Sequence, residues 1–421
     1  MIKSNFQVLY NLCEMLFVLP LYRLFKFGGQ PFGLHSRIVV YLLVAISFSR
    51  LCFEYGVRWS GDSARFSEWA DVLIHNDLNP FIYLQYSGRI FYSVWIFLVS
   101  LMKIIFADNW MIAIVTINFL CAFLTSIITI EAIAKFSKNR VVPIFSAILF
   151  SVSTEYFQWI PWVLSDITFS LLLSVVFVFL LSSIDKRKIG VSAKKIGASL
   201  AVVAFFFRPG GQIVAFFCVS FFVLAPYIVD KGEYNRKIVI NILLTIILFA
   251  IIAVFGWAAL MKNPHLLPLN IAHETFSQLS DEYKMGVVVY LKKETYRNAP
   301  QNIYDFAVII FLKMGYYLQF LSNNNGIFHN IINSVIFIFA GYSGLCAVLP
   351  ISNMSVDNLN RAWWGLFIVI CFTIFYATQY IDYDARYRMP LIPILIQMAA
   401  LGFNQIWNYM SSSNFFILSH K

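Results

Sequence analysis

Long apolar runs separated by short polar connections dominate the chain. A membrane-spanning helix needs roughly 20 mostly apolar residues, and the pattern predicts about twelve such helices in 421 residues. The expected fold is an all-α, polytopic transmembrane helical bundle in which 1–421 forms a single domain. The predicted spans are 38–53, 90–107, 110–134, 141–157, 167–183, 196–207, 213–229, 238–260, 303–321, 331–349, 363–380 and 391–407.

Two connections are longer than the others, at 54–89 and 261–302. We expect them to be the first and second long extracytoplasmic loops. Near the N-terminus, the apolar segment 6–25 is interrupted by Glu14 and Pro20. This interruption favours an interfacial helix on the cytoplasmic face over another span.

Composition agrees with a membrane location. Hydrophobic residues make up 60% of the chain and charged residues only 12%, whereas soluble domains carry about 25% charged residues. The net charge is +10, but the basic residues fall in short clusters between apolar runs, at 135–140, 186–195 and 231–237. That distribution is typical of the positive-inside rule, so we expect an integral membrane protein without a nucleic-acid partner.

The basic clusters create a conflict over orientation. If they are cytoplasmic, then counting back with one span per run places 54–89 inside. Counting forward from a cytoplasmic N-terminus places the same loop outside. One run must therefore be re-entrant or split, and the sequence favours the region 141–165.

The first long loop opens with "GDSARFSEWADVL", which is dense in acids and contains Arg65. Its apolar residues recur at helical spacing and predict an interfacial helix with its apolar side in lipid; they are Phe66, Trp69, Ala70, Leu73 and Ile74. Asp62 and Arg65 are three residues apart and share a face. A simpler alternative is that Asp62 or Ser63 caps this helix.

Further charges stand at the ends of apolar runs. Asp166 opens a run in "WVLSDITFS", Arg208 closes one in "FFFRPGGQ", and Arg386 and Arg388 lie in "DYDARYRMPLIP". Charges at such depth are costly and usually face a cavity or a partner. The six cysteines lie in apolar stretches without a CxxC pair, so the sequence implies no metal site and identifies no cofactor.

Together these segments resemble the GT-C glycosyltransferases that use polyprenyl-phosphate sugars, such as protein mannosyltransferases and aminoarabinose transferases. The similarity rests on "GDSARF" in the first loop, "LSDITFSLLL", the Arg208-Pro209 pair and the C-terminal "RYRMPLIPILIQMAALG". Many members carry two adjacent acids in the first loop, whereas here Ser63 follows Asp62. The resemblance covers the chain in order, although each motif is short.

The resemblance implies a cell-envelope enzyme in the membrane, most simply the bacterial inner membrane. It would move a sugar from a polyprenyl-phosphate donor to a glycan, lipid or protein acceptor, with inversion at the anomeric carbon. Asp62 would act as the general base, with Asp166 as the second catalytic candidate. Arg65, Arg208, Arg386 and Arg388 would bind the donor phosphate, because guanidinium groups pair with phosphate in a bidentate way.

Two alternatives remain open from the sequence. An O-antigen-type polymerase would need catalytic arginines in 261–302, where Arg297 is available. A transporter or flippase of lipid-linked glycans would need polar residues along several mid-membrane spans and two symmetric halves. Neither pattern is clear, and the sequence does not identify the sugar, the acceptor or a divalent-metal requirement.

Overall fold

The structure is a computed structural model, and it describes eight stretches of the chain. The predicted segments 6–25, 238–260 and 261–302 lie outside them. The described stretches are 32–85, 89–137, 139–184, 191–228, 303–321, 326–348, 354–378 and 385–412.

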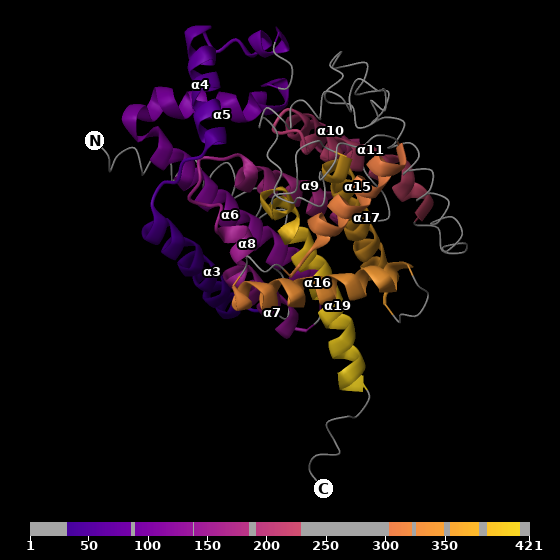
Figure 1. The fold of residues 1–421 in the computed structure, drawn as a ribbon. Coiled ribbons are helices and arrows are strands. Elements are labelled where there is room, and N and C mark those ends of the chain that lie inside the picture. Colours follow the sequence, from indigo (N-terminus) through magenta and orange to yellow (C-terminus); the bar gives the residue numbers. More distant parts are fainter. Residues whose placement is uncertain are drawn as a thin grey trace.

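The described residues form helices joined by connections, with one isolated backbone bridge (Figure 1). The elements are α3 Leu34–Tyr55, α4 Gly61–His75, η2 Pro80–Gln85, η3 Arg89–Tyr92, α5 Ser93–Phe106, η4 Ala107–Asn109, α6 Trp110–Phe136, α7 Val141–Val152, α8 Thr154–Phe157, α9 Asp166–Ile184, α10 Val191–Phe205, α11 Gly211–Ile228, α15 Ile303–Leu318, α16 Ile327–Val348, α17 Val356–Thr378, α18 Ala385–Arg388, η7 Met389–Leu391 and α19 Ile392–Ser412.

Five helical segments in the described part are long and apolar enough to cross a membrane; they are Leu34–Tyr55, Arg89–Phe136, Ile327–Val348, Asp357–Ala377 and Arg386–Tyr409. Four shorter apolar helices accompany them, at Val141–Val152, Asp166–Ser182, Lys195–Phe205 and Gly211–Phe222. The prediction of an all-helical protein with helices long and apolar enough to span a membrane is confirmed for the described residues. The count of twelve spans stays a prediction.

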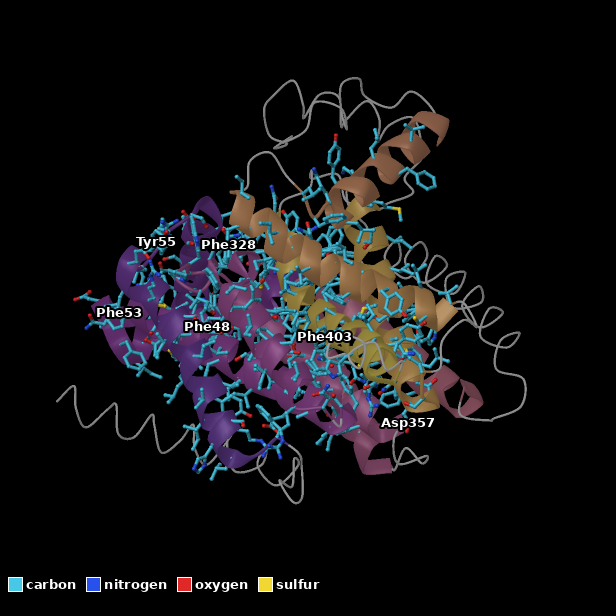
Figure 2. All side chains as sticks on the ribbon, turned by 90° about the horizontal axis from the view of Figure 1, so that it is seen from below. Phe48, Phe53, Tyr55, Phe328, Asp357 and Phe403 are labelled. Atoms are coloured by element: carbon cyan, nitrogen blue, oxygen red, sulfur yellow. The ribbon has the colours of Figure 1, made fainter. Side chains whose placement is uncertain are left out.

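Helix α3 separates an inward face from an outward one. Phe48 is fully buried against the bundle, whereas Phe53 on the same helix is 89% exposed (Figure 2). Leu34, Ile38 and Ile46 are also exposed. An apolar helix face of this kind is costly in water and suits contact with lipid tails.

The predicted runs 90–107 and 110–134 differ from the structure. They belong to one helical segment, Arg89–Phe136, which turns at η4, where Ala107 has a φ of 44°. The first arm, α5, has 14 residues and is about 21 Å long at 1.5 Å per residue. It packs on α4 at one corner of the molecule (Figure 1), and it is shorter than a hydrocarbon core of about 30 Å.

The run 141–157 is also interrupted. Helix α7 ends at Val152, and Ser153 separates it from the single turn of α8. An irregular stretch then leads to Asp166, the first residue of α9. This stretch contains Pro161 between Trp159 and Trp162, and a proline within the run interrupts the helical pattern.

The two ends of the C-terminal helix α19 lie in different surroundings. Its centre crosses α16 closely, since a Cβ on Gly402 would lie 2.2 Å from the carbonyl oxygen of Phe339. Its late residue Asn404 lines a polar cavity together with Arg140 and Asn358. Its N-terminal end follows α18, which carries Arg386. Arg386 and Asn404 belong to one helical segment, Arg386–Tyr409, and at 1.5 Å per residue they are roughly 27 Å apart along it.

Candidate functional site

Helix α4 holds Asp62 in its first turn, but Asp62 does not cap it. The N-cap is Ser60, whose hydroxyl accepts from the backbone N–H of Ser63 at 3.2 Å, while Ser63 accepts from the backbone N–H of Ser60 at 3.1 Å. This capping box satisfies two backbone donors. The prediction that Asp62 or Ser63 is the cap is therefore wrong, and the Asp62 carboxylate is left for other partners.

The apolar side of α4 lies inside the protein rather than in lipid. Phe66, Ala70 and Leu73 are buried, and the ring of Phe66 contacts Trp95 of α5 with 6.3 Å between centroids. On the other side, Asp71 pairs with Lys103 of α5 at 2.7 Å. The predicted helix exists, and packing against α5 fixes its place.

Backbone contacts hold the start of α4 beside the segment that precedes α9. The N–H of Arg58 donates to the carbonyl of Pro161 at 2.8 Å, and the N–H of Val163 donates to the carbonyl of Arg58 at 3.2 Å. Asn118 of α6 supports the same segment by donating to the carbonyl of Trp162 at 2.8 Å. Because this segment leads directly to Asp166, these bonds set where residues 62 and 166 meet.

Asp166, the first residue of α9, and Arg208, in the turn between α10 and α11, form a buried ion pair. Their side chains are only 3% and 4% exposed. The turn after Arg208 is tight, since a Cβ on Gly211 would lie 1.6 Å from the carbonyl oxygen of Ala204. Only glycine allows this close return of the chain, and the return keeps Arg208 at the site.

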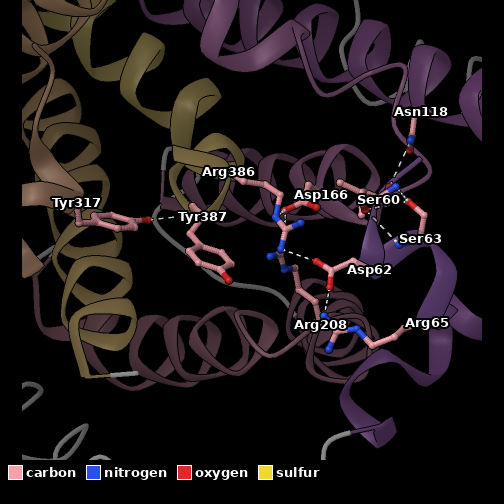
Figure 3. Close-up of polar contacts among 11 residues, drawn as sticks. Ser60, Asp62, Ser63, Arg65, Asn118, Asp166, Arg208, Tyr317, Arg386 and Tyr387 are labelled. Carbon is pink, nitrogen blue, oxygen red and sulfur yellow. Dashed lines mark hydrogen bonds and ion pairs between the residues drawn. The ribbon is translucent and has the colours of Figure 1, made fainter. Parts of the chain in front are cut away.

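Arg386 links the two carboxylates. Its Nη2 lies 2.7 Å from Oδ2 of Asp62, and its Nε lies 3.9 Å from Oδ1 of Asp166. Arg65 pairs with Asp62 from the same helix and is mostly exposed (Figure 3). We call the whole group the site network; its members are Asp62, Arg65, Asp166, Arg208 and Arg386.

Arginines outnumber carboxylates among the members of the site network. Three guanidinium groups, of Arg65, Arg208 and Arg386, face the carboxylates of Asp62 and Asp166. Solvent exposure increases across the network: the Asp166 side chain is 3% exposed, that of Arg386 16% and that of Asp62 22%. An anion can therefore approach from the Asp62 side and meet arginines already in place.

Two opposing influences act on the pKa of the Asp62 carboxyl. Burial raises it, whereas the guanidiniums of Arg386 and Arg65 lower it through charge and hydrogen bonding. The guanidiniums prevail, so the pKa of Asp62 lies below its ordinary value. Asp62 is consequently ionised at neutral pH.

Arg388 lies in a different group from the other predicted arginines. Its Nε and Nη2 bind the two oxygens of Glu155 at 2.6 and 2.7 Å, and its Nη1 donates to the carbonyls of Tyr317 and Gln319 at 2.9 and 2.6 Å. Glu155 also accepts from Asn333 at 2.9 Å. We call these residues the Arg388 cluster. Here every guanidinium nitrogen of Arg388 has an acceptor within the protein.

Sequence reasoning missed three residues that build these groups. Glu155 is fully buried in "STEYFQW", and Asn118 is fully buried in the apolar run "VTINFLCAF". A lone polar residue inside an apolar run is a usable signal for a buried contact. Arg58 acts through its backbone, for which the sequence gives no signal.

Within the described residues, no group of three or more His, Cys, Asp or Glu side chains is placed to hold a metal ion. The site network contains two carboxylates, and arginines occupy both of them. The donor set described here therefore suits an anion better than a cation.

No protein-family model and no curated protein sequence matches this chain. Among solved structures, it is similar to the archaeal oligosaccharyltransferase AglB from Archaeoglobus fulgidus, solved in complex with an inhibitory peptide and a dolichol-phosphate. The identity is 14% and the TM-score 0.46, over 91% of this chain. The match covers 52% of that protein, so this chain spans about half its length.

Proposed function

We propose that this protein is an inverting glycosyltransferase of the membrane that moves a sugar from a polyprenyl-phosphate donor to a glycan, lipid or protein acceptor. One observation carries the proposal. Arg386 joins Asp62 and Asp166, and Arg208 completes the group, although these residues come from four distant parts of the chain. A lipid-phosphate donor needs both charge types at one place, near the end of the helices.

The arginines match the leaving group. In the proposed reaction, the bond between the anomeric carbon and the phosphate oxygen breaks, and negative charge builds on the departing polyprenyl phosphate. Guanidinium groups positioned before the reaction stabilise that charge in the transition state. Arg208 is paired with the buried carboxylate of Asp166, while Arg386 and Arg65 lie on the more accessible side.

Asp62 matches the role of general base. It is the more accessible of the two carboxylates, so an acceptor hydroxyl can reach it. In the free protein, Arg386 and Arg65 weaken its basicity. A donor phosphate that draws these arginines away would raise the pKa of Asp62 toward its ordinary value and strengthen the base. A single base assisting direct displacement gives inversion.

We further propose that the site network faces the extracytoplasmic side. If α5 does not cross the membrane, then counting from a cytoplasmic N-terminus puts 54–109 outside and each basic cluster, 135–140, 186–195 and 231–237, inside. The conflict found in the sequence then disappears. The position of Arg140 supports this arrangement. Arg140 lines the cavity near Asn404 of α19, whereas Arg386 lies at the opposite end of that helix.

Orientation can be tested by thiol labelling in intact cells. In a background without native cysteines, Glu68→Cys places a thiol on the exposed side of α4, and Arg140→Cys places one on the exposed far end. An impermeant reagent should label position 68 alone, and position 140 only after the membrane is opened. Labelling of position 140 in intact cells would contradict the proposed orientation.

Activity is tested with purified full-length protein and a panel of polyprenyl-phosphate sugars. The expected result is release of polyprenyl phosphate with one of them, dependent on an added acceptor. A transporter would instead move an intact lipid-linked glycan across a vesicle membrane without releasing polyprenyl phosphate. That outcome, with no release from any donor, would overturn the proposal.

A further inference from the structure

Three tyrosine rings are stacked beside the site network. Tyr376 of α17 stacks on both Tyr317 and Tyr387, with ring centroids 5.7 and 5.0 Å apart and interplanar angles of 15° and 14°. The Tyr317 hydroxyl donates to the backbone carbonyl of Tyr387 at 3.2 Å (Figure 3). Because rings on both faces confine Tyr376, packing alone fixes the position of its hydroxyl.

The Tyr376 hydroxyl is buried and has no hydrogen-bond partner among the described residues. It interacts electrostatically with Arg208, Asp166 and Arg386. It also lies directly beside Gly210, since a Cβ on that glycine would be 2.7 Å from the hydroxyl oxygen. The hydroxyl is thus held against the turn that carries Arg208.

Two other buried donors near the Arg208 turn also lack a hydrogen-bond partner. Nε of Arg208 and Nε2 of Gln212 are buried and lack a partner within the described part of the chain. Buried donors are nearly always hydrogen-bonded in proteins, and exceptions call for an explanation. These donors would be satisfied by a ligand that supplies acceptors.

The chemistry of these donors selects the ligand. A hydroxyl, an amide N–H and a guanidinium N–H all donate, and the nearby carboxylate of Asp166 is occupied by Arg208. An oxygen-rich anion accepts from all three. We infer that Tyr376 donates its hydroxyl hydrogen to the phosphate that Arg208 binds, and so distinguishes a phosphate-bearing lipid from its neutral alcohol. This inference rests on the proposed function.

The test measures binding of polyprenyl phosphate and of the corresponding polyprenol to the purified full-length protein in detergent. Tyr376→Phe keeps the stacked ring and removes only the hydroxyl. The dissociation constant for polyprenyl phosphate should rise about tenfold or more, as expected for a lost hydrogen bond to a charged group. Polyprenol binding should not change.

Two further variants separate the hydroxyl from the stack. Tyr317→Phe removes a hydroxyl from the same stack whose partner is a backbone carbonyl, and should leave phosphate binding within about twofold, the error of additive behaviour. Gly210→Ala should weaken binding by displacing the Tyr376 hydroxyl. The backbone of Gly210 is not left-handed, so alanine fits there once the hydroxyl is gone. Gly210→Ala combined with Tyr376→Phe should therefore bind no more weakly than Tyr376→Phe alone.

The outcomes are distinguishable. Failure of the wild-type protein to bind polyprenyl phosphate would overturn the proposed function, and this inference with it. Normal wild-type binding that is unchanged in Tyr376→Phe would overturn the inference alone. Equal weakening in Tyr317→Phe and Tyr376→Phe would also overturn it, because the stack rather than the hydroxyl would then be responsible.

Discussion

Arg386 and Arg388 are two residues apart, yet they belong to groups of opposite character. In the Arg388 cluster, Nε, Nη1 and Nη2 all donate to oxygens of the protein, and the side chain is 3% exposed. In the site network, Nε of Arg208 has no acceptor in the described part of the chain. All guanidinium donors of Arg388 are therefore satisfied within the protein, whereas the site network contains a buried donor without an acceptor.

The difference separates a structural role from a binding role. A buried arginine whose donors are all satisfied gains nothing from a ligand and would lose contacts by turning to one. The Arg388 cluster joins α8, the end of α15, α16 and α18. An arginine with spare donors and partial access can bind an anion without breaking the fold. Residue type alone does not distinguish the two.

The largest expected effect is on stability, from Arg388→Ala. Removing one partner of a buried ion pair leaves the Glu155 carboxylate buried without its guanidinium partner, which costs about 3–5 kcal/mol. We expect a large fall in the temperature midpoint of unfolding in detergent. Replacing both partners, as in the double variant Glu155→Leu with Arg388→Met, should restore part of the lost stability. If Arg388→Ala instead keeps its stability and loses donor binding, Arg388 belongs to the phosphate site, as its sequence position suggested.

Asp62→Asn should act on the reaction and spare the fold. Because Ser60 is the N-cap of α4, the substitution leaves the capping box intact. Loss of the general base should lower sugar transfer about 10²-fold or more. Glu68→Gln is the matched control, since Glu68 is exposed on the same helix. It should transfer at the wild-type rate. Asp71→Asn is less suitable because Asp71 pairs with Lys103. Normal transfer by Asp62→Asn would direct attention to Asp166.

Arg208→Lys should have a smaller effect on transfer than the loss of Asp62. Lysine keeps the charge and can still reach a carboxylate, but it loses the planar fork that pairs with phosphate. We expect about a tenfold loss of transfer, the equivalent of one charge-assisted hydrogen bond, and a deeper loss in Arg208→Ala. Steady-state rates with a fixed donor measure both variants. Wild-type turnover in both would remove Arg208 from the site.

The smallest expected effect is a shift in pH dependence. The pKa of Asp62 is depressed in the free protein. Ionised Asp62 therefore contributes to folding stability above its unfolded pKa, and this contribution is lost as pH falls through the folded pKa. The acid limb of kcat/KM reports the free enzyme and should follow that depressed pKa. The acid limb of kcat reports the donor complex and should lie at higher pH, since phosphate competes for Arg386 and Arg65. Coincident limbs would mean that these arginines stay on Asp62.

Much of the site could be predicted from the sequence, because charge at the end of an apolar run has few explanations. Asp62, Arg65, Asp166, Arg208 and Arg386 were each identifiable, and the structure brings them together. Arg388 was identifiable as a buried charge but not by its partner, since Glu155 is 233 residues away. Tyr376 carried no signal, as tyrosine is common throughout this chain.

The sequence by itself determined the fold class and the places where charge is concentrated. Hydropathy decides whether a segment can leave water, and that depends on composition over about 20 residues, so it is readable locally. The tertiary structure decided how the apolar helices pack. Helix α5 is as apolar as a span, but the chain turns at Ala107 and α5 packs on α4. The tertiary structure likewise decided which buried arginine is satisfied. Pairing depends on residues far apart in the chain, and no local pattern records their separation in space.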